Sequence, residues 1–123
     1  MPHAQPWLLC LGFRLEADGK CLAYSGDARL CAGIERLSKN ADLLIHWCYR
    51  SEGQTISPQL DARSPTPSLI AQMSACVGVK RLLSTHIRVQ MDEPAARAAA
   101  LGALQDHFPR EAGIAEDLDQ ITL

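Results

Sequence analysis

The chain has 123 residues, of which 47% are hydrophobic and 21% charged, and its formal net charge is -2 at pH 7. This length suits one compact domain over residues 1–123 and is too short for two. Lys and Arg are spread along the chain, so the charge pattern predicts no nucleic-acid partner, and no segment has the roughly 18 apolar residues that a membrane span needs. The five cysteines form no CxxC pair, which excludes a disulfide framework or zinc knuckle and favours a cytoplasmic protein.

In the first half of the chain, the hydrophobic pattern changes period between strand-like and helix-like segments. Asp18-Gly19 predicts a hairpin turn, because such a pair tolerates the positive φ angles of a type I′ turn. Leu30, Ile34 and Leu37 share one face of a helix. The predicted elements are a strand at 7–17, a strand at 20–25, a helix at 30–39 and a buried strand at 42–49.

The second half begins with a polar segment, 51–65, that we predict to be a loop. Thr66 can cap a helix whose first residue is Pro67, and Gly78 should end that helix. The elements expected after it are a strand at 81–86, a helix from about 94 to 108 and an edge strand at 114–123. The whole order predicts an α/β (α+β) fold, with one sheet and helices packed on one side of it.

Two side chains that can bind metal follow directly after predicted strands. Asp27 comes after Ser25-Gly26, although a Gly-Asp pair in that place is also typical of a turn or a helix N-cap. His86 ends the strand at 81–86, where a neutral imidazole can bind a divalent cation or make a structural hydrogen bond. His3 is expected to be solvated in a terminal tail.

Four motifs occur in an order that resembles the C-terminal half of the metallo-β-lactamase superfamily, in particular its ribonuclease Z and arylsulfatase-like branch. The final GIAEDLDQITL also resembles the last strand of that branch, so the likeness covers nearly the whole chain. It implies half of an αββα sandwich, with one mostly antiparallel or mixed sheet and helices on one face. The four motifs are YSGD at 24–27, DLLIH at 42–46, PSLIAQMSACVGVKRL at 67–82 and LLSTHI at 82–87.

The resemblance implies roles for particular residues. In the family, the aspartate of the GD motif bridges two metal ions and the histidine of the Thr-His motif completes one site; these roles fall on Asp27 and His86. The donor types suit zinc, with two ions in a complete site, and manganese or iron would also be compatible. The implied reaction is attack by metal-activated hydroxide on an ester-type bond, such as a lactone, sulfate ester or phosphodiester.

Other positions depart from the family pattern. The main ligand motif, His-x-His-x-Asp-His, has no counterpart here, so we expect the isolated chain to bind metal weakly or not at all and to be inactive. His46 keeps the histidine of the family's His-Glu motif and is a candidate catalytic or structural residue. Trp47 and Ser64 stand where ribonuclease Z has a glutamate and a histidine that act as an acid-base pair, and this difference argues against RNA processing. Trp47, Ser64 and Thr85 are expected to line the substrate pocket.

Half of a sandwich would leave one apolar sheet face uncovered, over more area than a soluble monomer usually exposes. A homodimer, a separate N-terminal half-domain, or a reshaped monomer that folds its own strands over would cover it, and two-fold pairing is the default for identical chains. Two functions remain open: a metal-dependent hydrolase, or a fragment of one, and a non-catalytic dimeric module that keeps the half-fold for assembly.

Overall fold

The computed structural model describes residues 1–123 as a five-stranded sheet with helices. None of the helices has the length and apolar character to cross a membrane. In chain order the elements are β1 (Phe13–Ala17), β2 (Lys20–Tyr24), α1 (Ala32–Ser38), β3 (Leu43–Trp47), α2 (Pro58–Asp61), α3 (Pro67–Cys76), β4 (Arg81–Thr85), the 3-10 turn η1 (Val89–Met91), α4 (Pro94–His107) and β5 (Glu111–Ile114).

The sheet is mixed, and its strands lie side by side in chain order. β1 pairs antiparallel with β2 through the predicted turn, in which Asp18 and Gly19 have φ angles of 49° and 72°. The three other pairings, β2 with β3, β3 with β4 and β4 with β5, are parallel. The expected mixed α/β sheet is therefore confirmed, whereas a mostly antiparallel sheet, the other form expected, is wrong because three of the four pairings are parallel.

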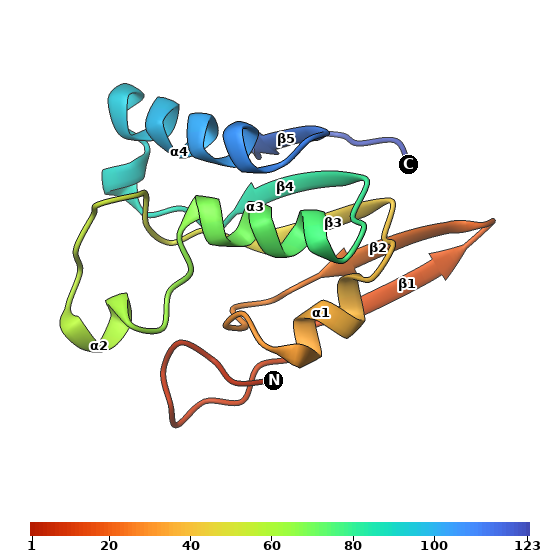
Figure 1. Cartoon of the computed structure of the whole chain (residues 1–123), viewed down its shortest axis with the longest axis horizontal. Coiled ribbons are helices and arrows are strands. Elements are labelled where there is room, and N and C mark those ends of the chain that lie inside the picture. Colours follow the sequence, from red (N-terminus) through yellow and green to blue (C-terminus); the bar gives the residue numbers. More distant parts are fainter.

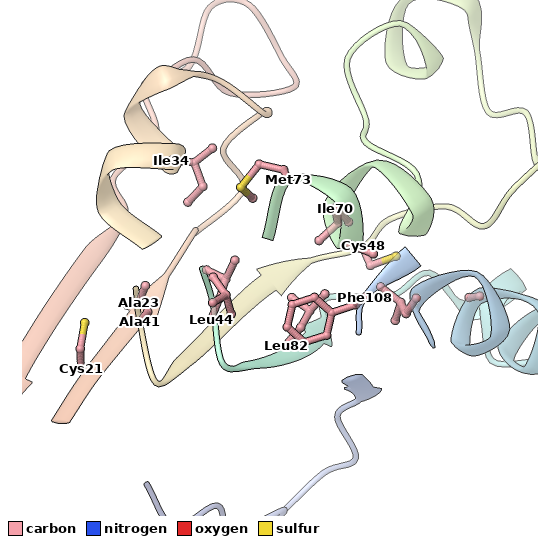
Figure 2. Packing of buried hydrophobic residues seen from close by; sticks show 14 of the residues in the cluster. Cys21, Ala23, Ile34, Ala41, Leu44, Cys48, Ile70, Met73, Leu82 and Phe108 are labelled. Carbon is pink, nitrogen blue, oxygen red and sulfur yellow. The ribbon is translucent and has the colours of Figure 1, made fainter. Parts of the chain in front are cut away.

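Helices α1, α3 and α4 cover one face of the sheet (Figure 1). Each connects two adjacent parallel strands, and right-handed crossovers that always step in the same direction place their helices on the same side. Side chains from the two layers meet in one core: Figure 2 shows Ile34 of α1 and Met73 of α3 near Leu44 of the sheet. Ile34 and Leu44 are fully buried, and burying such a side chain contributes about 1.5–3 kcal/mol.

The opposite side of the sheet, which we call the open face, carries no helix. Residues that pair directly across strands share a face, and the register places Phe13 beside Tyr24 and Leu15 beside Leu22. The same face continues through Ile45 and Leu83. It stays apolar and exposed at the β1 end, where Phe13 is 53% and Leu15 56% exposed.

The ends of α3 confirm one sequence prediction and change another. Gly78 follows the helix with a φ of +78°, as expected for a residue that ends a helix in the left-handed region. Thr66 is the N-cap residue, but its side chain does not cap the helix. Instead, the Glu52 carboxylate accepts a hydrogen bond from the Ser68 backbone N–H at 2.8 Å. Glu52, a residue of the preceding loop, therefore accepts the hydrogen bond of a backbone N–H in the first turn of α3.

That loop, predicted over 51–65, contains the single helical turn α2. The Arg50 guanidinium organises it by donating hydrogen bonds to the backbone carbonyls of Ser64, Gln54 and Asp61, at 3.0 to 3.2 Å. Arg50 therefore fixes the path of the loop and has few donors left for a ligand.

The strand predicted at 114–123 is wrong in position. The last strand is β5, which ends at Ile114 and pairs with β4, while residues 115–123 form no strand. In this tail Leu118 has a φ of +68°, and the Glu116 N–H donates to the Asp119 carboxylate at 2.8 Å. This tail therefore forms a local turn, although its alternation of apolar and polar residues predicted an extended strand.

Candidate functional site

A pocket of about 340 Å³ lies beyond the C-terminal ends of β2, β3 and β4. Because these strands are parallel, the residues that follow them meet at the same edge of the sheet. Asp27, Tyr49 and His86 follow the three strands in turn, and all three line the pocket. Topology therefore gathers side chains that are far apart in the sequence.

The turn that presents Asp27 depends on a glycine. Gly26 has a φ of +54°, and a Cβ atom at this position would lie 2.5 Å from the backbone oxygen of Leu11. Side chains other than hydrogen are therefore excluded by both conformation and space. The Trp47 indole N–H donates to the Ala28 backbone oxygen at 2.6 Å and braces the other side of the turn.

His86 reaches the pocket through a strained backbone. Its φ is +54°, a left-handed conformation that is rare outside glycine and that residues at functional sites sometimes adopt. The imidazole Nε2 lies 3.6 Å from Asp27 Oδ1, and the ring centroid is 5.8 Å from that of Tyr49. The structure thus brings together the two side chains singled out from the sequence; their role as metal ligands stays a prediction.

His3 is a third member of this group, although nothing in the sequence predicts its place beside Asp27. Its Nε2 lies 3.4 Å from Asp27 Oδ2, and its side chain is only 16% exposed, so the expectation of a solvated tail is wrong. The N-terminal segment folds back onto the Asp27 turn, where the Arg29 N–H donates to the Pro2 carbonyl at 2.9 Å. A lone histidine near the start of the chain gives no local signal of such a long-range contact.

The three side chains do not form a complete metal site in this arrangement. No group of three or more His, Cys, Asp or Glu side chains lies close enough together to hold a metal ion. In addition, His3 Nδ1 accepts a hydrogen bond from the Gln5 N–H at 2.8 Å, so the proton of the neutral ring lies on Nε2, facing Asp27. Metal ligation through Nε2 would require the other tautomer. The residues fit a partial donor set only.

His46 does not line this pocket. Side chains alternate along β3, so Trp47 turns toward the pocket while His46 lies on the helix-covered face with Leu44. His46 is fully buried, and this burial lowers its pKa from 6.5 to about 4. Its Nδ1 contacts the Trp47 backbone oxygen at 2.7 Å, whereas Nε2 has no partner. The ring therefore stays neutral and enclosed, without access to a substrate in the pocket.

The three residues expected in the substrate pocket divide between two hollows. Trp47 and Ser64 line the pocket that contains Asp27. Thr85 instead lines a neighbouring hollow with Arg88, and His86 borders both. Thr85 is the last residue of β4 and pairs with Trp47, whereas His86 follows the strand with a left-handed φ of +54°.

Comparisons with known proteins agree with this geometry, although no family model matches the chain. The chain is 32% identical over 82 residues to ribonuclease Z of Mycobacterium tuberculosis (strain H37Rv), which is 62% of this chain and 30% of that protein. It is 35% identical to ribonuclease Z of Methanothermobacter thermautotrophicus over 56% of this chain and 22% of that protein. Over part of its length, the chain is therefore similar in sequence to ribonuclease Z proteins.

A solved structure shows the same fold. The metallo-β-lactamase fold protein YhfI from Bacillus subtilis superimposes with a TM-score of 0.75 and 21% sequence identity, over 94% of this chain and 44% of that protein. The chain spans about a third or less of the length of the curated relatives it matches. The five-stranded sheet with its helices thus corresponds to less than half of a metallo-β-lactamase fold protein.

Proposed function

We propose that this chain is part of a metal-dependent hydrolase of the metallo-β-lactamase superfamily that acts on an ester-type bond. The observation that carries the proposal is the Asp27 carboxylate lying between two imidazoles, with His3 and His86 each within 3.6 Å of one of its oxygens. Carboxylate and imidazole groups are the donors that zinc accepts in hydrolytic sites. Similarity to ribonuclease Z supports the same reaction class.

The metal site in this proposal is formed partly by residues of this chain and partly by residues outside it. A catalytic zinc site usually has three converging protein ligands and an open position. Here His3 and His86 each contact one oxygen of Asp27, but the three side chains do not converge on one point where a metal ion could bind. We therefore expect the isolated chain to bind zinc weakly and not to turn over substrate, and further donors to come from residues outside this chain.

Zinc titration by calorimetry tests the donor assignment. We expect weak binding to the unaltered chain and at least tenfold weaker binding after Asp27→Asn or His86→Ala, because each removes a direct donor. His107→Ala is the matched control, since His107 is exposed on α4 and does not line the pocket. Equal zinc affinity in all four proteins, or none in any, would overturn the assignment.

A second candidate function is supported by the open face. Phe13, Leu15 and Tyr24 on this face are 53%, 56% and 38% exposed. A contiguous apolar patch of this kind usually marks an interface. The corresponding function is a non-catalytic module in which a second copy of the chain covers the open face.

Analytical ultracentrifugation distinguishes this module from a monomer. We expect the unaltered chain to sediment as a dimer and Leu15→Lys to sediment as a monomer, because the charge would lie inside the interface. Leu118→Lys is the control, since Leu118 is 97% exposed and lies outside the sheet. A monomer at all concentrations without substitution would refute pairing through the open face.

A further inference from the structure

One side chain beside the pocket has a hydrogen-bonding group that the protein does not use. Ser64 is 3% exposed, and its Oγ has no hydrogen-bond partner. A buried hydroxyl without a partner is costly, and most such groups in folded proteins are satisfied by protein, water or ligand. Because Ser64 lines the pocket, a molecule bound there can supply the missing partner.

The backbone holds Ser64 firmly in this place. Its N–H donates to the Leu60 carbonyl at 2.7 Å, and its carbonyl accepts a hydrogen bond from Arg50 Nε at 3.2 Å. A hydroxyl can turn its proton toward an arriving oxygen without any movement of the main chain. Ser64 is therefore a preorganised donor that costs little to orient when a ligand binds.

The lining of the pocket restricts the kind of ligand. Five of its ten lining residues are hydrophobic, among them Leu8, Trp47, Tyr49 and Leu60. No Lys or Arg lines it, and the only carboxylate is that of Asp27. A polyanion such as RNA is normally bound through several cationic side chains. This lining suits a compact, mainly apolar molecule without formal charge.

The arginines near the pocket do not change this conclusion. Arg50 uses its guanidinium on three loop carbonyls. The Arg88 guanidinium lies over the ring of Tyr49, 5.6 Å from its centroid, and lines the neighbouring hollow together with Asp92, Glu116 and Asp117. Carboxylates therefore accompany Arg88. A further hollow that Ser64 borders, lined by Arg29, Arg50 and Arg63, likewise contains Asp61.

We propose that the pocket binds a compact, uncharged ester-type molecule whose apolar group lies against Trp47, Tyr49 and Leu60 and whose oxygen accepts a hydrogen bond from Ser64. That the bound molecule is a substrate rests on the proposed hydrolase function. That the pocket binds such a molecule rests only on the unpartnered Ser64 hydroxyl and on the residues that line the pocket. Ser64 is then a positioning residue that selects the ligand.

Binding of acetanilide, an uncharged amide that mimics a phenyl ester, tests this inference in zinc-free protein by calorimetry or ligand-observed NMR. We expect acetanilide to bind, and Ser64→Ala to weaken its binding about fivefold, the effect of one hydrogen bond. Ser51→Ala is the matched control, since Ser51 lies in the same loop, is 2% exposed and also has an unpartnered hydroxyl, but does not line the pocket. Phenyl phosphate should bind more weakly than acetanilide.

Equal losses in Ser64→Ala and Ser51→Ala, no binding of acetanilide, or tighter binding of phenyl phosphate would each overturn the inference. The zinc titration separates this result from failure of the hydrolase proposal, because Ser64→Ala should keep the zinc affinity of the unaltered chain. If zinc binds through Asp27 and His86 while acetanilide does not bind, the ligand inference alone is wrong. If acetanilide depends on Ser64 while zinc never binds, the hydrolase proposal alone is wrong.

Discussion

The burial of His46 predicts a specific loss of stability in acid. The imidazole is fully buried, and burial lowers its pKa from 6.5 to about 4. Between these pH values the unfolded chain binds a proton at this position and the folded chain does not, so the unfolded state gains stability as the pH falls. The contribution of His46 is therefore fully present above pH 6.5 and is lost as the pH falls toward 4.

The size of this effect follows from the two pKa values. At about 1.4 kcal/mol for each pH unit, the gap between 6.5 and about 4 corresponds to about 3 kcal/mol, and about 2 kcal/mol of it is lost by pH 5. Cys48 does not interfere, because burial raises its pKa to about 12 and the thiol stays neutral over this range.

Urea denaturation at pH 7 and pH 5 measures this effect in the unaltered chain, in His46→Gln and in His107→Gln. The unaltered chain and His107→Gln should lose about 2 kcal/mol more unfolding free energy between the two pH values than His46→Gln loses. Glutamine removes the titration while keeping a polar side chain of similar size. The same pH dependence in all three proteins would show that His46 is accessible to protons in the folded state.

Three further predictions concern the backbone around the pocket. Gly26→Ala should lower the unfolding free energy by about 2 kcal/mol in urea denaturation, because the left-handed φ and the contact with the Leu11 carbonyl both oppose a side chain. His86→Gly should be about 1 kcal/mol more stable than His86→Ala in the same assay, since only glycine relieves the strain at φ +54°. Arg50→Lys should speed limited proteolysis within residues 51–65, because an ammonium cannot reach three carbonyls with the fixed fork of a guanidinium; unchanged cleavage would contradict this.

Features that depend on neighbouring residues could be predicted from the sequence. Asp18-Gly19 gives the hairpin turn because both residues tolerate positive φ, and the apolar run around Leu44 gives a strand whose residues are all buried or half-buried. Gly78 ends its helix for an equally local reason. These signals lie within a few residues of the structure that they determine.

Features that depend on distant residues could not be predicted in the same way. β5 is a short strand whose pattern is weak, and it forms because β4 offers a parallel edge some thirty residues earlier, with Leu83 beside Gly113. His3 reaches Asp27 only because the N-terminal segment folds back along the turn after β2. The alternation along β3 is by contrast local: Trp47, expected at the pocket from the sequence, lines it, and His46 on the other face does not.

The same topology determines both the pocket and the open face. Crossovers that always step in one direction leave one sheet face without helices, and parallel strands bring their C-terminal ends to one edge. Trp47 belongs to the open side of β3, two residues after Ile45, and it also forms a wall of the pocket. A polypeptide that packs on the open face would therefore border the pocket, where it could add donors to those of Asp27 and His86. The two proposals, metal donors from outside this chain and a second copy on the open face, therefore concern neighbouring surfaces of the same sheet.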